Sequence, residues 1–202
     1  MKVTIFMCHP DDELIFGWPV LYNKEIEKDI FICSSDANNP ERQWCKHRKN
    51  SLFDMCVKLG LNCKVLDYDS EFYRTPSRYA DPPLLEDVQR DIAKHITEVD
   101  SDVIFKHNPV GEYGHLDHKF LFDLVVQYSK VPVWFTDICL ESNWHDHTEI
   151  PEKIRKHLYT KHIGDYTLDL MEYELDSLFY RNKNVWTWNK PPVEKCSIYE
   201  LE

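Results

Sequence analysis

The sequence predicts an α/β fold in which helices cover both faces of a mostly parallel sheet. Two observations support this fold class. Short, almost continuously apolar runs alternate along the chain with longer segments in which apolar residues recur at helical spacing. Strands that are apolar throughout are typical of parallel sheets, because helices bury both of their faces. The chain has 202 residues, 43% of them hydrophobic, so it is long enough to bury such a core as one domain, residues 1–202.

Five apolar runs are expected to be the strands. They cover residues 3–9, 29–36, 63–69, 102–109 and 131–136. In folds of this class, ligands bind at the carboxyl ends of the strands, beside the point where the strand order reverses. The segments that directly follow the strands are therefore the places where a functional site is expected.

The segments between the strands are expected to be helices. The first extends from Glu13 to about Lys28 and is broken near Gly17 and Pro19. The second ends at Gly60, because glycine commonly terminates helices. The residues of this second helix that recur at helical spacing are Arg48, Leu52, Met55, Cys56 and Leu59.

Two further helices are expected over residues 84–99 and 116–129. The apolar residues of the earlier one share a face; they are Leu85, Val88, Ile92 and Ile96. The aromatic-rich segment after about Asp165 shows no comparable pattern. We expect residues 165–202 to be an extension that packs on the rest of the domain.

Composition argues against several functions. The formal net charge of −11 disfavours non-specific binding to nucleic acid or to anionic membranes. Neither GxGxxG nor GxxxxGK[ST] occurs, so no dinucleotide or P-loop site is expected. The seven cysteines include no CxxC pair, which indicates reduced, mostly buried thiols. No segment resembles a signal peptide or a membrane-spanning helix, so the sequence predicts a soluble, cytoplasmic protein.

An unusual acidic segment, MCHPDDELIF at residues 7–16, follows the first expected strand. Asp11, Asp12 and Glu13 are adjacent and repel one another, which indicates a nearby counter-charge. A helix N-terminus is one candidate, because acids are favoured in the first turn of a helix. The other candidates for this counter-charge are a metal ion and a lysine or arginine elsewhere in the chain. Helix capping does not explain the preceding His9 and Pro10.

A second unusual segment, NPVGEYGHLDHKF at residues 108–120, follows the fourth expected strand. His115 and His118 are three residues apart, so they share a face on the first turn of a helix. If the first and fourth strands end at one edge of the sheet, these histidines converge with His9 and Asp12. Histidine nitrogens with a carboxylate oxygen suit zinc, and three protein ligands leave a position open for water. Such a metal lowers the pKa of water from ~15.7 toward ~7 and so provides a nucleophile.

The two segments together resemble the LmbE-like family, also called the PIG-L family, of zinc-dependent N-deacetylases. That family has HPDDE after the first strand and a later GHxDH, and both stand unbroken here at residues 9–13 and 114–118. The resemblance extends from residue 1 to about residue 162 and includes RKNSLFDMCVKLG and the stretch from Lys156 to His162. It implies a Rossmann-like three-layer sandwich. It also implies removal of an acetyl group from an N-acetylglucosamine-type group.

Carried over residue by residue, the resemblance makes His9, Asp12 and His118 the zinc ligands. Asp11 becomes the general base, because a carboxylate beside the metal accepts a proton from the attacking water. A site of two histidines and one carboxylate also accepts other divalent ions such as Fe²⁺ and Co²⁺, so the native metal stays open.

The resemblance assigns further residues around this centre. His115, held by Asp117, becomes the acid or an electrostatic stabiliser, and Tyr113 matches a tyrosine that some members use on the tetrahedral oxyanion. Arg48 matches an arginine that often touches the sugar. Asp69 resembles the acid that holds sugar hydroxyls after the third strand.

Two departures from the family pattern concern the substrate. Residues 34–39 read SSDANN where the family commonly has Thr-x-Gly-Glu, and Ser51 stands where a glutamate is usual. The expected substrate is a small N-acetylated sugar or glycoconjugate. Alternatives are another N-acyl substrate, such as a modified nucleoside or antibiotic precursor, and a non-catalytic metal- or sugar-binding module. Residues 144–147, WHDH, form a competing cluster that we interpret as a solvated loop. The sequence leaves the oligomeric state open.

Overall fold

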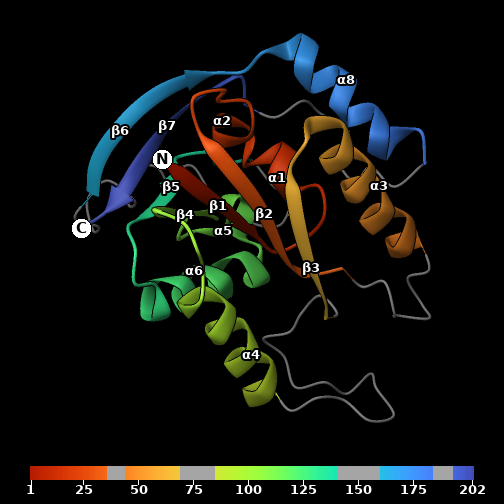
Figure 1. Cartoon of the computed structure of the whole chain (residues 1–202). Helices are drawn as coiled ribbons and strands as arrows, with labels where there is room; N and C mark the ends of the chain where they lie inside the picture. Colours follow the sequence, from red (N-terminus) through yellow and green to blue (C-terminus); the bar gives the residue numbers. More distant parts are fainter. Residues whose placement is uncertain (36–43, 69–84, 141–159, 184–192) are drawn as a thin grey trace.

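One mixed sheet forms the centre of the computed structural model (Figure 1). The structure describes residues 1–35, 44–68, 85–140, 160–183 and 193–202. Within these residues, seven strands lie in the order β3-β2-β1-β4-β5-β7-β6. Their bounds are β1 Lys2–Met7, β2 Glu27–Ser34, β3 Asn62–Tyr68, β4 Val103–Lys106, β5 Val133–Thr136, β6 Thr160–Thr167 and β7 Lys195–Leu201.

The strands from β3 to β5 run parallel. On one side of them β7 pairs antiparallel with β5, and β6 pairs antiparallel with β7. Strand β1 pairs with β2 on one side and with β4 on the other. The strand order therefore reverses between β1 and β4, and the loops that leave these two strands flank the position where ligands bind in such sheets. The predicted α/β fold with a mostly parallel sheet is confirmed.

Helices cover both faces of the sheet. Their bounds are α1 Asp12–Ile15, α2 Trp18–Leu21, α3 Trp44–Leu59, α4 Leu85–Thr97, α5 Gly111–Gly114, α6 Leu116–Tyr128 and α8 Leu170–Arg181. Figure 1 shows α4 and α6 on one side of the sheet, with α1, α2, α3 and α8 on the other. This arrangement gives three layers.

Each face of the sheet has its own apolar core, because successive side chains of a strand point to opposite faces. In β1, Val3 and Ile5 join the core beneath α1, α2, α3 and α8. Phe6 instead joins the core beneath α4 and α6, where Ile92 and Leu121 are also buried. The near-continuous apolar run of β1 thus reflects burial on both faces.

The first helical segment differs from its expected extent. It consists of the two short helices α1 and α2, and Lys28 lies in β2 rather than in a helix. A Cβ at Gly17 would lie 2.6 Å from the carbonyl oxygen of Glu13, so only glycine permits this tight turn between the helices. Lys28 Nζ then donates hydrogen bonds to the carbonyl oxygens of Leu21 at 2.9 Å and of Asn23 at 2.5 Å. These bonds fix the turn between α2 and β2.

Strand β4 is also shorter than expected, since it ends at Lys106 instead of residue 109. The next residue, His107, is buried and contacts Glu112 in α5. Asn108 Oδ1 accepts hydrogen bonds from the backbone nitrogens of Val110 and Glu112, both at 3.1 Å. This turn ends the strand and directs the chain across the sheet edge.

The segment after Asp165 contributes to the sheet itself. Strand β7 pairs with β5 and β6 with β7, so the end of the chain joins the sheet beside β5. Helix α8 packs on α3 and α1. Asp176 accepts a hydrogen bond from Lys58 Nζ at 2.5 Å, which links α8 to α3. The sequence pattern did not predict these elements.

Candidate active site

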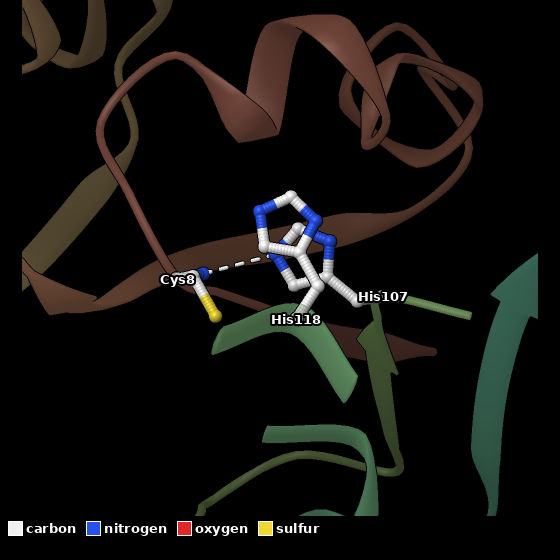
Figure 2. Close-up of side chains that lie close together, drawn as sticks. All are labelled: Cys8, His107 and His118. Carbon is white, nitrogen blue, oxygen red and sulfur yellow. Dashed lines mark hydrogen bonds between the residues drawn. The ribbon is translucent and has the colours of Figure 1, made fainter. Parts of the chain in front are cut away.

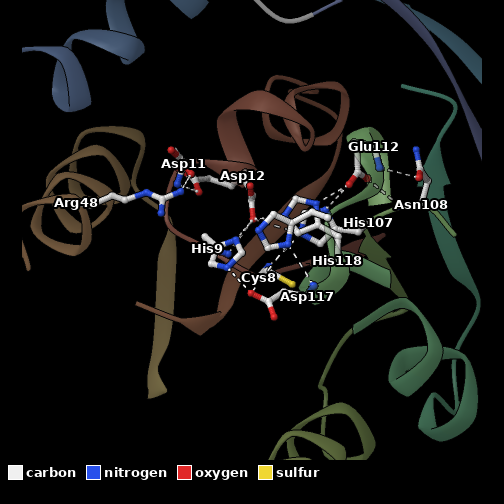
Figure 3. Close-up of polar contacts among 12 residues, drawn as sticks. Cys8, His9, Asp11, Asp12, Arg48, His107, Asn108, Glu112, Asp117 and His118 are labelled. Atoms are coloured by element: carbon white, nitrogen blue, oxygen red, sulfur yellow. Dashed lines mark hydrogen bonds and ion pairs between the residues drawn. The ribbon is translucent and has the colours of Figure 1, made fainter. Parts of the chain in front are cut away.

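The two unusual segments of the sequence meet at the carboxyl ends of β1 and β4. Residues 8–13 leave β1 and residues 107–118 leave β4, and Figure 3 shows their side chains pointing toward one another. Because β1 and β4 are neighbours on either side of the reversal in strand order, this is where the fold predicts a ligand.

Asp12, His9 and His118 bring three donor atoms together. Asp12 Oδ2 lies 3.2 Å from His9 Nδ1 and 3.4 Å from His118 Nε2. Ligand atoms at ~2.0–2.1 Å from a tetrahedral zinc ion are ~3.3 Å apart, so both distances fit two edges of such a site. Among the described residues, the buried His118 Nε2 has no hydrogen-bond partner. A buried nitrogen of this kind is available to bind an ion.

Among the described residues, two histidine-containing groups could hold a metal. The first group consists of His9, His115 and His118, and it has one donor atom from each ring within 4.8 Å of the other two. The second combines His118 with Cys8 and His107 (Figure 2). In this second group, His107 Nε2 already accepts a 3.0 Å hydrogen bond from the backbone nitrogen of Cys8. Burial also raises the pKa of the Cys8 thiol well above its usual range, which disfavours the thiolate.

Asp117 holds His9 rather than His115. Its Oδ2 lies 3.1 Å from His9 Nε2, whereas its distance to His115 Nδ1 is 4.0 Å. The predicted link between Asp117 and His115 exists through the backbone instead, because the Asp117 amide donates a 3.2 Å hydrogen bond to His115 Nδ1. His115 is thus the N-cap of α6. The difference arises because the capping geometry directs the His115 ring toward the amide.

The charges of the site depend on these contacts. Burial disfavours a charged His9, but Asp117 and Asp12 outweigh it and raise the pKa of His9 to about 10. Burial likewise opposes ionisation of Asp12, yet His118 and His107 hold the pKa of its carboxyl well below the usual range. In the metal-free site the His9 ring therefore carries a proton beside an ionised Asp12, and a bound cation would displace that proton.

Asp11 lies beside this centre in a strained backbone conformation. Its φ is 109°, in the left-handed region that residues other than glycine rarely adopt. The backbone nitrogen of Asp11 donates a 2.9 Å hydrogen bond to Glu13 Oε2, and its carboxylate forms a close ion pair with Arg48. Asp11 and Arg48 are both buried. The predicted base and the predicted sugar-binding arginine therefore contact each other.

Glu13 connects this turn to the far end of the chain. Tyr180, in α8, donates a 2.5 Å hydrogen bond to Glu13 Oε1. Burial raises the pKa of Glu13 to about 8, although the Tyr180 hydroxyl opposes that rise. No sequence pattern identifies Tyr180, since it lies in the aromatic-rich segment after Asp165 that shows no clear periodicity.

His115 is the most accessible histidine of the site. Its side chain is 28% exposed, against 7% for His9 and 0% for His118. Burial, followed by the neighbouring His118 and His9, lowers the pKa of His115 to about 3, so its ring is neutral near pH 7. Tyr113 packs against the rings of His115 and His118 at 5.5 Å between centroids. Burial raises the pKa of Tyr113, which keeps its hydroxyl protonated.

Two residues of the site, His107 and Glu112, were missed by the sequence analysis. Glu112 Oε2 lies 3.0 Å from His107 Nδ1 and 2.7 Å from His118 Nδ1. The sequence pattern includes His107 in the strand expected over residues 102–109 and assigns no role to Glu112. The available signal was that polar residues directly follow β4, at the end where ligands bind.

The structure brings together all but one of the predicted site residues. These are His9, Asp11, Asp12, Arg48, Tyr113, His115, Asp117 and His118. Asp69 lies outside the described residues, as does the competing cluster at residues 144–147. In the part of the chain that the structure describes, no helix is long and apolar enough to cross a membrane.

Comparison with protein families finds a match over more than half of the chain. The model described as "PIG-L: GlcNAc-PI de-N-acetylase" matches residues 4–129. This segment runs from β1 into the first residue after α6 and includes both motifs of the site.

Two curated proteins match a similar part of the chain. An uncharacterised protein of Acanthamoeba polyphaga mimivirus is 23% identical over 129 residues, which cover 60% of this chain and 55% of that protein. A probable N-acetylglucosaminyl-phosphatidylinositol de-N-acetylase of Dictyostelium discoideum is 27% identical over 121 residues, covering 58% of this chain and 45% of that protein. The chain thus spans about half the length of the curated relatives that it matches.

Solved structures share the fold over a longer range. A deacetylase in complex with teicoplanin, from the biosynthesis pathway of teicoplanin, superimposes with a TM-score of 0.61 at 10% identity. The match covers 100% of this chain and 97% of that one. The N,N'-diacetylchitobiose deacetylase of Pyrococcus horikoshii gives 0.55 at 15% identity, covering 92% and 72%. At such identities these similarities concern the fold.

Proposed function

The chain belongs to the PIG-L family, and on this premise we propose that it is a metal-dependent N-deacetylase. It would remove the acetyl group from an N-acetylated amino sugar, free or in a glycoconjugate, and release acetate and a primary amine. The observation that carries this proposal is the convergence of Asp12 Oδ2 with His9 Nδ1 and His118 Nε2, at spacings that suit zinc.

His9, Asp12 and His118 are the proposed metal ligands. When bound, zinc would polarise the acyl carbonyl and make a water molecule acidic enough to react near neutral pH. The donor set also suits Fe²⁺ or Co²⁺, so the choice of metal rests on availability. The hydrogen bond from His9 Nε2 to Asp117 supports the assignment, because it leaves His9 Nδ1 directed at Asp12.

Asp11 is the proposed general base. Its carboxylate would accept a proton from the attacking water as the new C–O bond forms. The same proton would then pass to the nitrogen of the sugar as the C–N bond breaks, so that the products are acetate and an amine. The ion pair with Arg48 and the hydrogen bond to Glu13 support this role, since both hold Asp11 in one orientation.

His115 and Tyr113 are the proposed hydrogen-bond donors to the acyl oxygen. Because His115 Nδ1 accepts the Asp117 amide, the proton of the neutral ring is on Nε2 and can be donated. The Tyr113 hydroxyl packs beside the same ring. Donors that are already oriented before charge develops contribute strongly to catalysis. Arg48 and Asp69 remain the proposed contacts to the sugar.

The test combines elemental analysis of the purified protein with an amine-release assay on N-acetylated sugars and nucleotide sugars. About one zinc per chain, with release of amine from a member of the panel, is the expected result. No metal after zinc is added back would contradict the proposal. Replacing zinc by Co²⁺ or Fe²⁺ in the same assay identifies the most active ion.

A different N-acyl substrate is the second candidate. It is favoured by the residues after the second strand, SSDANN at positions 34–39, which replace the pattern common in the family. Metal uptake without release from acetylated sugars would support this candidate. The panel is then extended to N-acylated nucleosides and glycopeptide precursors.

A further inference from the structure

We propose that Glu112 is a positioning residue that sets the tautomer of His118 and so directs its Nε2 lone pair at the metal. This inference rests on the metal site of the proposed function. It also assigns a different task to His107, the second histidine bound to Glu112. Glu112 and His107 both lie outside the two motifs that define the family resemblance.

The carboxylate of Glu112 accepts hydrogen bonds from three groups. Its Oε2 lies 2.7 Å from His118 Nδ1 and 3.0 Å from His107 Nδ1, and its Oε1 accepts a 2.8 Å bond from the backbone nitrogen of Asn108. All four residues are buried. Figure 3 shows the contacts of Glu112 with the two rings. An ionised carboxylate only accepts hydrogen bonds, so both imidazoles must place a proton on Nδ1.

This protonation pattern leaves one lone pair for a metal. A neutral imidazole with a proton on Nδ1 has a bare Nε2. His107 Nε2 lies 3.3 Å from Asp12 Oδ2 and accepts the backbone N–H of Cys8 at 3.0 Å, which ties the end of β4 to the end of β1 (Figure 2). His118 Nε2 is buried, lies 3.4 Å from Asp12 Oδ2, and has no hydrogen-bond partner among the described residues.

Glu112 therefore separates the two candidate metal groups. It makes His118 a ligand, whereas it makes His107 a structural link whose lone pair is already used. The group of Cys8, His107 and His118 then lacks a ligand. The group of His9, His115 and His118 keeps the open His118 Nε2, which lies beside Asp12. Carboxylates that hold metal-binding histidines in this way tune both ring orientation and basicity.

The backbone at Glu112 supports a functional reason for its position. Its φ is 53° with ψ −53°, a conformation that L residues rarely adopt. Among the described residues, Asp11 is the other non-glycine residue with positive φ, and it lies across the same site. Strained residues persist where surrounding contacts fix them, and they concentrate at active sites. Asn108 Oδ1 provides such a contact by accepting the Glu112 amide at 3.1 Å.

The direct test is the zinc affinity of Glu112→Gln, measured by competition with a chelator. Glutamine has the shape of glutamate, but one of the two carboxylate oxygens is replaced by an NH₂ group that cannot accept a hydrogen bond. It therefore cannot accept hydrogen bonds from both the histidine rings and the Asn108 amide. We expect zinc binding to weaken by roughly 10- to 100-fold, and the absorption spectrum of the Co²⁺ form to change. Glu200→Gln is the matched control, because Glu200 accepts a hydrogen bond from Trp134 in a different part of the sheet. The zinc affinity of Glu200→Gln should equal that of the wild type.

Each outcome has a distinct meaning. Wild-type protein that binds no zinc overturns the proposed function together with this inference. Equal zinc affinities of wild type and Glu112→Gln overturn this inference alone.

A measurement on the wild-type protein decides the matter if Glu112→Gln does not fold. Histidine ¹H–¹⁵N correlation spectra of the zinc-loaded protein report which ring nitrogen carries the proton. We expect the rings of both His107 and His118 to carry it on Nδ1. A proton on Nε2 of His118 would contradict the inference.

Discussion

Tyr180 donates a 2.5 Å hydrogen bond to Glu13 Oε1, although the two residues are 167 positions apart in the chain. Glu13 Oε2 accepts the backbone nitrogen of Asp11 at 2.9 Å. One carboxylate thus joins α8 to the strained turn that presents the proposed base. Helix α8 lies outside the residues that match the family model, yet it supports the site.

Tyr180→Phe tests this support. The change removes the hydroxyl and leaves buried Glu13 Oε1 without that donor, so we expect the free energy of unfolding to fall by about 1–3 kcal/mol. Turnover should fall as well, because Asp11 loses an indirect constraint. Denaturant unfolding and the amine-release assay measure the two effects. Tyr128→Phe, at an exposed position of α6, is the control. Unchanged stability and turnover in Tyr180→Phe would show that this hydrogen bond has no role.

Asp11→Asn tests the general base. Asparagine tolerates the positive φ of this position, so the turn should persist while the basic oxygen is lost. We expect turnover to fall by roughly 10²- to 10⁴-fold with zinc content unchanged. Asp123→Asn, on the exposed face of α6, controls for the loss of one negative charge. Full hydrolysis by Asp11→Asn would rule out the assignment, and it would favour a different base.

The paired histidines should respond differently to removal. His118→Ala is expected to abolish most zinc binding, because its Nε2 is a proposed ligand. His115→Ala should retain nearly full zinc occupancy and react more slowly, because His115 is proposed to bind the acyl oxygen. Elemental analysis after dialysis measures the occupancy of both variants. Equal loss of zinc would instead identify His115 as a ligand, as the group of His9, His115 and His118 permits.

Lys106→Met tests the pH dependence of stability. Lys106 is buried, its Nζ donates a 2.8 Å hydrogen bond to the carbonyl oxygen of Phe122, and burial holds its pKa well below the usual value. Between that lowered pKa and ~10.4, the unfolded chain binds more protons than the folded protein, so wild-type stability rises with pH. Methionine removes the cost of burying the charge.

We therefore expect Lys106→Met to be more stable than the wild type at pH 7, because folding of the wild type must remove the proton of the buried lysine at this pH. The difference should shrink as the pH approaches 10. Thermal unfolding between pH 6 and pH 10 measures it. Lys94→Met, at an exposed position of α4, should show no such trend. A constant difference across this pH range would mean that Lys106 is not neutralised by burial.

The elements that were predicted well depend on local patterns. Helix α3 ends at Leu59, directly before Gly60, because a glycine at positive φ terminates the helix whatever lies around it. Strand β1 was recognisable because both of its faces are buried. The end of the first helical segment was wrong, since Lys28 is held by carbonyl groups of the preceding turn while its backbone joins β2.

By itself, the sequence determined the fold class and the two segments that form the site, because residue periodicity and motif composition are local properties. Only the tertiary structure decided which carboxylate holds which imidazole. Asp117 contacts His9 across 108 positions, and Glu112 joins two histidines that lie on opposite sides of it in the chain. Hydrogen bonds form over about 3 Å and depend on direction. They are therefore settled by the relative placement of β1, β4, α6 and α8, which no local pattern encodes.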